Sequence, residues 1–270
     1  MLSFGMRKYK VKSFFYMAGE LEKWIRIIKP PLYPFARLKN FFENFLMKGN
    51  PLIATGQVIA NKFSHLSPTH TYHSTTHNKV IKRSPKEVYT NCIFVGAFYK
   101  PKRAIDLVNA INILKEKYPN IKCFMLGSGP LTNDLKKYIA LNQLQQYVEM
   151  PGYVKSREEL ENYYRKADFL VLPSLTEGSP RVLPEAMSFG VIPLAVKGAG
   201  SNDYIIKPYE NGALFKAKSA ESLASELELF FENRELYEEA LGGIYEYAQE
   251  YTLDRELDKV MKFVFKELEL

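Results

Sequence analysis

From about residue 90 onward, short apolar segments alternate with segments of helical periodicity, and this alternation limits the possible folds more than any other feature. The segment 104–118, for example, places Ile105, Val108 and Ile111 on one helical face. Strands that alternate with helices at this spacing predict an α/β fold with a doubly wound parallel sheet. The expected strands are 91–98, 120–130, 147–154, 168–174, 191–196 and 211–215, and the expected helices are 104–118, 131–144, 157–167, 184–189, 219–232, 234–249 and 254–268.

Glycines gather where the predicted strands end. In a doubly wound sheet, ligands bind beyond the carboxyl ends of the strands. A glycine there lets the backbone approach a ligand closely, although turn chemistry explains each glycine equally well. Their joint placement predicts a ligand site at this edge of the sheet. The glycines are Gly96, Gly127, Gly129, Gly178, Gly198 and Gly200.

The most informative stretch joins a predicted strand to a predicted helix and holds Glu177 and Glu185. Pro184 suits the first helical position, where no N–H donor is needed, and the preceding turn has free amides except at Pro180. Unpaired N–H groups at a helix start favour phosphate, whereas carboxylates accept hydrogen bonds from hydroxyls. Two interpretations stay open at this point: a nucleotide-sugar site, or a capped surface helix with solvated glutamates.

The charge of the chain is uneven. Residues 1–103 carry 18 lysines and arginines against 4 acidic residues, whereas residues 104–270 carry 19 against 26. The basic part is also rich in aromatic residues, so it is predicted either to contact an anionic lipid surface or to form a solvated basic face. No recognisable nucleic-acid module accompanies the charge, so nucleic acid is not expected as a partner. No apolar run reaches the length of about 18 residues that a membrane span needs.

The first 90 residues are less regular. The segment 11–19 is compatible with a strand, 19–48 with helices interrupted by prolines, and 50–63 with a strand followed by a short helix. Residues 64–87 are polar and lack apolar periodicity, which predicts a linker or an ordered loop. Two strands and two helices are too few for a complete doubly wound domain.

Histidines and cysteines allow narrower predictions. The histidine spacing in the segment 64–79 is compatible with zinc, but no cysteine or acidic ligand accompanies it, so no metal is predicted. The favoured alternative is that one histidine lines a cleft. The two cysteines lie in short apolar runs and are expected in the core as reduced thiols. The residues are His65, His70, His73, His77, Cys92 and Cys123.

Several segments together resemble one enzyme family. The stretches FVGAFYKPKRAIDLVNAI, FMLGSGPL, GYVKSREELENYYRKADFLVLPSLTEG, EGSPRVLPEAMSFGVIPLA and ENGALF resemble, in order and spacing, the donor-binding domain of the retaining nucleotide-sugar glycosyltransferases of family 4 (glycosyl transferases group 1). The resemblance covers residues 88–265, and 10–87 more loosely. It implies a GT-B fold of two Rossmann-like domains.

The resemblance also divides the chain. It implies a partial acceptor-side domain with a linker over 1–87, a nucleotide-sugar donor-binding domain over 88–250, and a C-terminal helix over 251–270 that packs back on the N-terminal part. The implied activity is transfer of a hexosyl group from a UDP- or GDP-sugar, with retention, to a glycan or lipid-linked acceptor in polysaccharide, capsule or cell-envelope glycan synthesis. The implied location is the cytoplasm, at the inner face of the cell membrane if the basic region contacts lipid.

Matching residues to the family motif implies a role for each. Glu185 matches the glutamate that binds the ribose, and Glu177 matches the one that faces the transferred sugar, either positioning it or stabilising charge. Lys102 matches a lysine that clamps the diphosphate, where leaving-group charge develops. The implied catalytic residues are Glu177 and Lys102. The implied donor-binding residues are Gly96, Arg103, Gly127, Gly129, Gly178, Ser179, Arg181, Val182 and Glu185, with no metal and no cofactor.

Two departures from the family pattern leave alternatives open. Ala97 stands where the family usually has an arginine, and Lys100, Arg103 or Arg181 are the candidate substitutes. The N-terminal part is shorter than the family's acceptor domain, so Met1 is interpreted as the start of a truncated gene, a misassigned start or one half of a split enzyme. A nucleotide-sugar-binding fragment without catalysis, and a sugar-nucleotide epimerase on the same fold, remain the alternatives.

Overall fold

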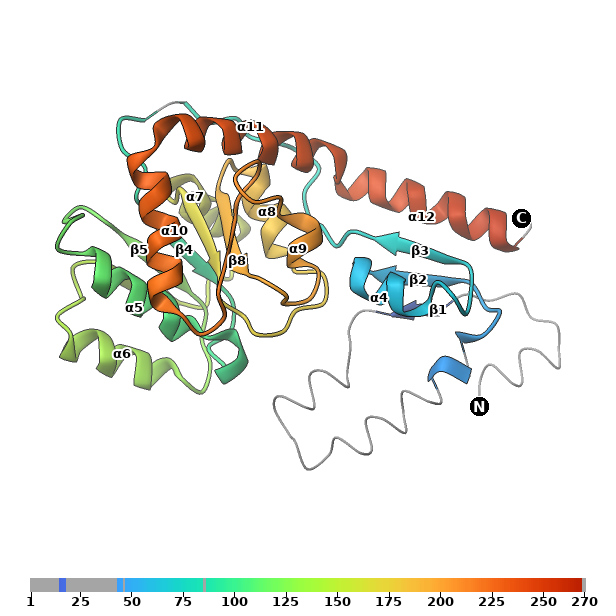
Figure 1. Ribbon diagram of the computed structural model, residues 1–270, viewed down its shortest axis with the longest axis horizontal. Helices are drawn as coiled ribbons and strands as arrows, with labels where there is room; N and C mark the ends of the chain where they lie inside the picture. Colours follow the sequence, from blue (N-terminus) through green and yellow to red (C-terminus); the bar gives the residue numbers. More distant parts are fainter. Residues whose placement is uncertain (1–14, 18–42, 46, 85, 269–270) are drawn as a thin grey trace.

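The larger part of the molecule is built on a six-stranded parallel sheet. The computed structural model describes residues 15–17, 43–45, 47–84 and 86–268 (Figure 1). The strand order is β6-β5-β4-β7-β8-β9, and every neighbouring pair is parallel. The predicted doubly wound α/β fold is thus confirmed. The strands are β4 (Cys92–Val95), β5 (Cys123–Leu126), β6 (Val148–Gly152), β7 (Phe169–Leu172), β8 (Ile192–Val196) and β9 (Ala213–Phe215).

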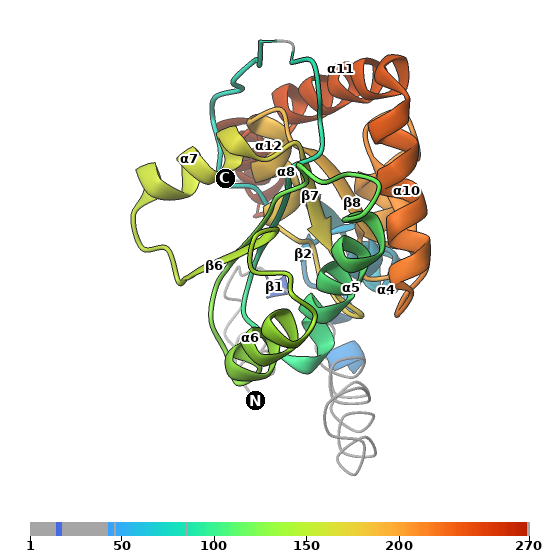
Figure 2. The same ribbon diagram turned by 90° about the vertical axis from the view of Figure 1, so that its left-hand side faces the viewer.

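Helices cover both faces of this sheet (Figure 2). Helix α5 packs beside α10, and α8 packs beside α11. Each predicted element begins and ends within four residues of its predicted bounds, because the apolar periodicity marks the buried face directly. The four-residue helix α9 was not predicted. The helices are α5 (Ala104–Leu114), α6 (Thr132–Leu141), α7 (Arg157–Lys166), α8 (Val182–Ser188), α9 (Asn202–Ile205), α10 (Ala220–Glu232) and α11 (Arg234–Glu250), with a 3₁₀ turn η2 (Lys100–Lys102).

A smaller parallel sheet, ordered β1-β2-β3, forms the second unit. Its strands are β1 (Phe15–Met17), β2 (Leu52–Thr55) and β3 (Thr69–Tyr72). Helix α4 (Gln57–Phe63) follows β2 and buries Ile59 and Phe63. The predicted strand and helix within 50–63 are confirmed. The interpretation of 64–87 as linker or loop was wrong for β3, because a half-buried, polar strand shows no apolar pattern. The helices expected within 19–48 lie mostly outside the described residues.

The chain returns to this second unit at its end. Helix α12 (Leu253–Leu268) lies along β3, and Figure 1 shows it reaching away from the large sheet. Its fully buried Glu256 accepts a hydrogen bond from the backbone N–H of His73 at 2.8 Å and forms an ion pair with Lys259. The ring of His70 stacks on Phe263, with the ring centres 5.4 Å apart. Within the described ranges, none of the helices combines the length and apolar character of a membrane span.

Histidine burial at this junction makes stability depend on pH. Burial lowers the pKa of His70, His73 and His77 from the ordinary value of 6.5. The unfolded chain therefore binds more protons than the folded chain just below pH 6.5, so acidification favours unfolding there. We expect the midpoint of thermal unfolding to be level above about pH 7 and to decrease as the pH falls through about 6.5 to 5.

The measurement is a series of thermal melts across this pH range. In His77→Asn the decrease should be shallower, because the buried imidazole of His77, held by Thr75 and the carbonyl of Ala248, no longer titrates. Substitution of the exposed His65 should leave the profile unchanged. A midpoint independent of pH down to about 5.5 would contradict the expectation.

Candidate functional site

Lys102 and Glu177 meet at the carboxyl ends of the central strands. Lys102 closes the turn η2 after β4, and Glu177 follows β7. The Nζ atom of Lys102 lies 2.7 Å from Oε1 of Glu177, and the side chains are 34% and 11% exposed. The N–H of Leu175 donates to the carbonyl of Pro101 at 2.8 Å, which ties the two loops together. Strand order reverses between β4 and β7, so the pair lies where ligands bind in such sheets.

The helix that carries Glu185 begins earlier than predicted. Helix α8 starts at Val182, so Pro184 is its third residue, not its first. A turn closed by the N–H of Leu183 and the carbonyl of Pro180 leads into the helix. Pro184 still lies in the first turn, where its missing N–H leaves no hydrogen bond unmade. Glu185 is the fourth residue and lies in the same first turn.

Three side chains from different segments hold the carboxylate of Glu185. Its Oε1 accepts from Nη1 of Arg157 at 2.9 Å and from the hydroxyl of Thr76 at 3.4 Å, and its Oε2 accepts from the hydroxyl of Tyr164 at 3.2 Å. Burial, with the nearby Glu185 carboxylate, raises the pKa of Tyr164, so its hydroxyl stays protonated and donates. The amino-acid sequence did not indicate any of these three partners, because nothing distinguishes them from ordinary surface or core residues.

The loop after β7 contacts the smaller unit. The hydroxyl of Ser179 accepts from the backbone N–H of Ser74 at 3.3 Å. Gly56, which follows β2, has φ +85°, and a Cβ added there would lie 2.3 Å from Oγ of Ser201 and 3.0 Å from Cβ of Ser179. The carboxyl ends of the two sheets therefore face each other at close range, and Gly56 permits this approach.

Backbone packing explains two of the predicted donor-binding glycines. A Cβ on Gly127 would lie 2.0 Å from the carbonyl oxygen of Gly96, and one on Gly129 would lie 2.8 Å from the amide nitrogen of Phe98. The loops after β4 and β5 are thus packed backbone against backbone. Gly127 also has a φ of +142°, a backbone conformation that other residues rarely adopt.

The other cations predicted near the site differ in availability. Arg103 adopts a left-handed conformation, with φ 52°, and its guanidinium pairs with the buried Asp106, the Nε–Oδ2 distance being 2.9 Å. Arg181 and Lys100 are exposed, and Val182 is half-buried. Arg181 lies close enough to Tyr72 that its charge opposes the effect of burial, which raises the pKa of that phenol.

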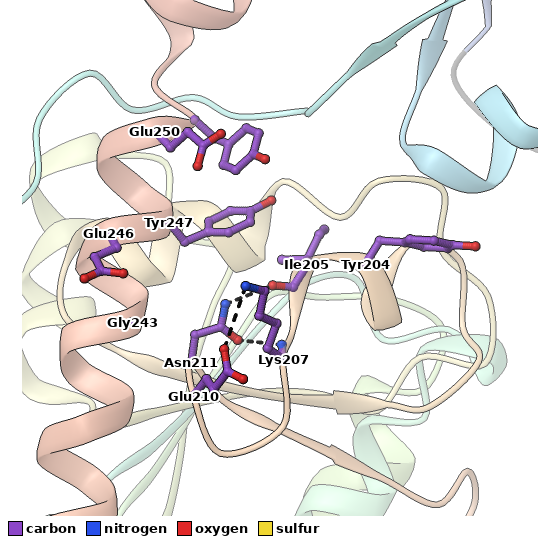
Figure 3. Close-up of a pocket in the computed structure, with 10 residues that line it drawn as sticks. Tyr204, Ile205, Lys207, Glu210, Asn211, Gly243, Glu246, Tyr247 and Glu250 are labelled. Atoms are coloured by element: carbon purple, nitrogen blue, oxygen red, sulfur yellow. Dashed lines mark hydrogen bonds and ion pairs between the residues drawn. The ribbon is translucent and has the colours of Figure 1, made fainter.

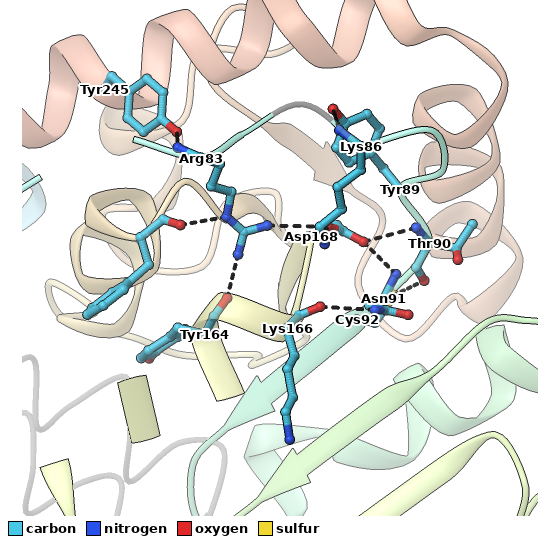
Figure 4. Close-up of polar contacts among 11 residues, drawn as sticks. Arg83, Lys86, Tyr89, Thr90, Asn91, Cys92, Tyr164, Lys166, Asp168 and Tyr245 are labelled. Atoms are coloured by element: carbon cyan, nitrogen blue, oxygen red, sulfur yellow. Dashed lines mark hydrogen bonds and ion pairs between the residues drawn. The ribbon is translucent and has the colours of Figure 1, made fainter. Parts of the chain in front are cut away.

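A buried carboxylate anchors the segment that connects the two units (Figure 4). Oδ1 of Asp168 lies 3.2 Å from Nη1 of Arg83 and 2.6 Å from Nζ of Lys86. Oδ2 accepts from the backbone N–H groups of Thr90 and Asn91 at 3.1 and 3.0 Å. The Asp168 side chain is 1% exposed, so these contacts replace its hydration.

The same arginine links this anchor to the candidate site. Besides Asp168, Arg83 donates to the backbone carbonyls of Phe189 and Tyr164, and its backbone N–H donates to the hydroxyl of Tyr245 (Figure 4). Tyr164 in turn holds Glu185 through its hydroxyl. The connecting segment is therefore fixed to the helices that position Glu185.

A cavity of about 190 Å³ lies between α11 and the segment after α9 (Figure 3). Tyr204, Tyr247 and Tyr251 line it, together with Asn211. The amide of Asn211 already donates to the carbonyl of Ile205 and accepts from the backbone N–H of Lys207, so it serves the loop. Charged side chains, among them Lys207, Glu210 and Glu250, complete the lining, so the cavity is polar as well as aromatic.

Packing and hydrogen bonds hold three of the histidines, and one of these, His77, lies close enough to Glu185 for that carboxylate to oppose the lowering of the His77 pKa by burial. The rings of His70 and His73 contact Phe263 and Tyr251, and His77 is held by Thr75 and the carbonyl of Ala248. In the described part of the chain, no three histidine, cysteine, aspartate or glutamate side chains gather as metal ligands.

Both cysteines are buried free thiols, as predicted. Cys92 and Cys123 are register partners on the neighbouring strands β4 and β5. Burial raises the pKa of both thiols, so each stays protonated in the core.

The family that matches the chain, a similar sequence and a similar solved structure are all named as glycosyltransferases. Residues 77–245 match the family described as Glycosyl transferases group 1. An uncharacterized glycosyltransferase of Haemophilus influenzae is 28% identical over 160 residues, which is 59% of this chain and 43% of that protein. Protein CapJ of Staphylococcus aureus is 34% identical over 42% of this chain and 27% of its own length. The chain thus spans less than half the length of these relatives.

Two solved structures illustrate the similarity of fold. Anabaena HepE, solved with UDP, is 15% identical, has a TM-score of 0.80, and is matched over 99% of this chain and 75% of its own. The C-terminal domain of a group 1 glycosyl transferase (LpcC) from Francisella tularensis is 24% identical, with a TM-score of 0.57 over 61% of this chain and 87% of its own. The GT-B architecture expected from the sequence agrees with these neighbours.

Proposed function

Because the chain belongs to the glycosyl transferases group 1 family, we propose that it transfers a hexosyl group from a nucleotide-sugar to a glycan or lipid-linked acceptor, with retention of configuration. The names of similar proteins support this class of acceptor. They include a putative colanic acid biosynthesis glycosyltransferase of Escherichia coli and the amylovoran biosynthesis glycosyltransferase of Erwinia amylovora. We place the work in polysaccharide, capsule or cell-envelope glycan synthesis.

The observation that carries the proposal is the contact between Lys102 and Glu177 at the point where strand order reverses. A cation and a carboxylate at this point suit the two ends of one ligand, a diphosphate and a sugar with hydroxyls. Among the residues that the structure describes, none accepts a hydrogen bond from the backbone N–H of Gly178 or Ser179. These amides are thus available to phosphate oxygens.

In the proposed reaction the nucleotide diphosphate leaves with negative charge. The ammonium of Lys102 and the amides of the loop after β7 balance that charge as it develops. Binding of a diphosphate draws Lys102 away from Glu177, which frees that carboxylate for the sugar. Glu177 then either orients the sugar through its hydroxyls or stabilises positive charge at the reacting carbon. The bond between the reacting carbon and the diphosphate oxygen breaks, the acceptor oxygen bonds to that carbon from the same face, and the acceptor proton passes to the departing phosphate oxygen.

Glu185 has a separate role in the proposal, as the group that holds the ribose hydroxyls. Arg157, Thr76 and Tyr164 fix its carboxylate in one orientation before a ligand arrives. A carboxylate oxygen has lone pairs for more than one donor, so these contacts leave room for a hydroxyl. Orientation in advance lowers the ordering cost of binding.

A second candidate is donor binding without transfer. The described part of the smaller unit has three strands, and the chain spans less than half the length of its relatives. This candidate therefore assumes a donor site without a working acceptor site. Transfer by the purified chain separates this candidate from the first. Incubation with UDP-sugars and no acceptor would detect a third activity, epimerisation. Membrane contact by the basic N-terminal region, and with it a place at the inner membrane face, stays a proposal, since half of the lysines and arginines of that region lie outside the described residues.

The proposed donor site is tested by calorimetric titration of UDP, GDP and their hexoses. We expect binding by the unaltered chain and an affinity about 10–100 times lower in Glu185→Ala, because hydrogen bonds to a charged group contribute about 1.5–3 kcal/mol. Glu158→Ala removes an exposed glutamate of α7 as the matched control and should bind normally. Equal affinity in all three proteins, or no heat with any nucleotide-sugar, would refute the donor site.

A further inference from the structure

Helix α12 carries an apolar stripe that its packing on β3 does not cover. Leu257, Met261 and Phe265 follow one another at intervals of four, so they lie on one side of the helix. They are 48%, 47% and 47% exposed, whereas Glu256 and Val264 are buried against the smaller unit. Three large apolar side chains in a row on a solvent-facing helix indicate an interaction surface. This stripe is distinct from the proposed donor site.

A second row of side chains runs beside the stripe, also at intervals of four. Its first half is acidic and its second half is basic, in the order Asp254, Asp258, Lys262 and Lys266. The side chains of Asp258, Lys262 and Lys266 are 59%, 76% and 82% exposed, and Asp254 also accepts a hydrogen bond from Asn78. In the single chain, Asp258 and Lys262 pair with each other at 2.6 Å.

We propose that this face of α12 binds the same face of a second copy of the chain, in antiparallel orientation about a two-fold axis. An axis through Met261 places Met261 against its own counterpart and Leu257 against Phe265 of the other copy. Both copies then cover their stripes fully. A two-fold interface of this kind uses one patch twice, as closed dimers do.

The charged row favours the antiparallel orientation. The same axis places Asp258 of each copy near Lys262 of the other, because the midpoint of these two positions lies one residue, about 1.5 Å along the helix, from Met261. Both charge contacts form on the same side of the stripe. In a parallel pair the two charged rows would lie on opposite sides of the stripe, so Asp258 of one copy would not meet Lys262 of the other and neither charge contact would form.

The same charges argue against an anionic membrane as the occupant. Asp258 borders the stripe directly and its side chain is 59% exposed, so the charges beside the stripe are not uniformly basic as they are on lipid-binding helices. One helix pair buries less surface than the roughly 1,200–2,000 Å² of a stable complex, so the dimer is expected to be weak, with a dissociation constant in the micromolar range.

The mass in solution tests the proposal directly. In sedimentation experiments over a range of concentrations, the full chain should pass from monomer to dimer, and Met261→Glu should weaken association about 100-fold by placing two charges in the apolar contact. Leu141→Glu, at an 82% exposed site on α6, is the matched control and should dimerise normally. A monomer at all concentrations, or equal dimerisation of both variants, would overturn the proposal.

Two charge variants test the orientation. Asp258→Lys gives four facing lysines and Lys262→Asp gives four facing aspartates, so each alone should dimerise several-fold more weakly. An equimolar mixture should recover dimers, because each lysine then faces an aspartate. Both positions are exposed, so folding is unaffected, which circular dichroism checks. If the mixture associates no better than its components, the antiparallel pairing is refuted.

Cross-linking supplies an independent readout. Met261→Cys places two thiols at the two-fold axis, and mild oxidation should join the chains covalently. Cys92 and Cys123 are buried and do not compete. Failure to cross-link, or vesicle binding that Met261→Glu abolishes in a monomeric protein, would assign the stripe to another occupant and overturn the dimer.

Discussion

Glu177→Ala is expected to lower the turnover of sugar transfer by about 100–1000-fold while leaving the unfolding temperature nearly unchanged. The loss follows from the proposed role of Glu177 at the reacting sugar, where one group contributes about 3–4 kcal/mol to the transition state. Its ion pair with Lys102 is partly exposed, at 34% for the lysine, so removing it costs at most about 1 kcal/mol of stability. The measurements are steady-state transfer kinetics and a thermal melt.

Lys102→Met and Glu177→Gln distinguish the proposed role of the lysine from that of the glutamate. Lys102→Met removes the cation that balances the diphosphate, so both donor affinity and turnover should fall, whereas Glu177→Gln should bind the donor almost normally and turn over slowly. Lys136→Met is the matched control, because Lys136 is an exposed lysine of α6 and is not among the cations predicted near the site. Unchanged turnover in Glu177→Ala, in a preparation whose unaltered chain transfers sugar, would refute the proposed role.

Asp168→Ala is expected to destabilise the folded chain by about 3–5 kcal/mol. The substitution leaves the guanidinium of Arg83, 10% exposed, without its buried counter-charge and removes the acceptor for two backbone N–H groups. Such uncompensated buried charge is among the most costly changes a core can undergo. Chemical denaturation followed by circular dichroism measures the effect.

A milder variant identifies the cause. Asp168→Asn keeps the shape and one acceptor but removes the charge, so it should cost less than Asp168→Ala. Glu161→Ala, which breaks an exposed ion pair with Arg157, is the control and should cost under about 1 kcal/mol. A loss below about 1 kcal/mol in Asp168→Ala would show that water replaces the carboxylate, against the buried geometry.

The sequence predicted the elements of the larger unit well, because those elements are governed by local periodicity. Strands such as Phe169–Leu172 are continuous apolar runs, since both of their faces are covered by helices. Their alternation with helices allowed few topologies other than a doubly wound parallel sheet. The buried cysteines followed from the same runs.

Most features that the sequence did not predict share one physical cause, which is that burial by a segment distant in the sequence leaves no local pattern. Strand β3 reads Thr-His-Thr-Tyr and becomes a strand only because β2 pairs with it. Glu256 reads as a solvated helix residue, yet it is fully buried, where it contacts Lys259 and the backbone N–H of His73, the residue after β3. Helix α9 has one turn, too short for periodicity to indicate.

The amino-acid sequence by itself determined which residue types stand at the carboxyl ends of the strands, including Lys102, Glu177 and Glu185, because strand and helix boundaries follow from local apolar spacing. Only the tertiary structure decided which of them meet. Lys102 and Glu177 are 75 residues apart and become neighbours because β4 and β7 are adjacent. The partners of Glu185 come from three further segments, and no local rule relates them, since sheet order and helix packing set those distances.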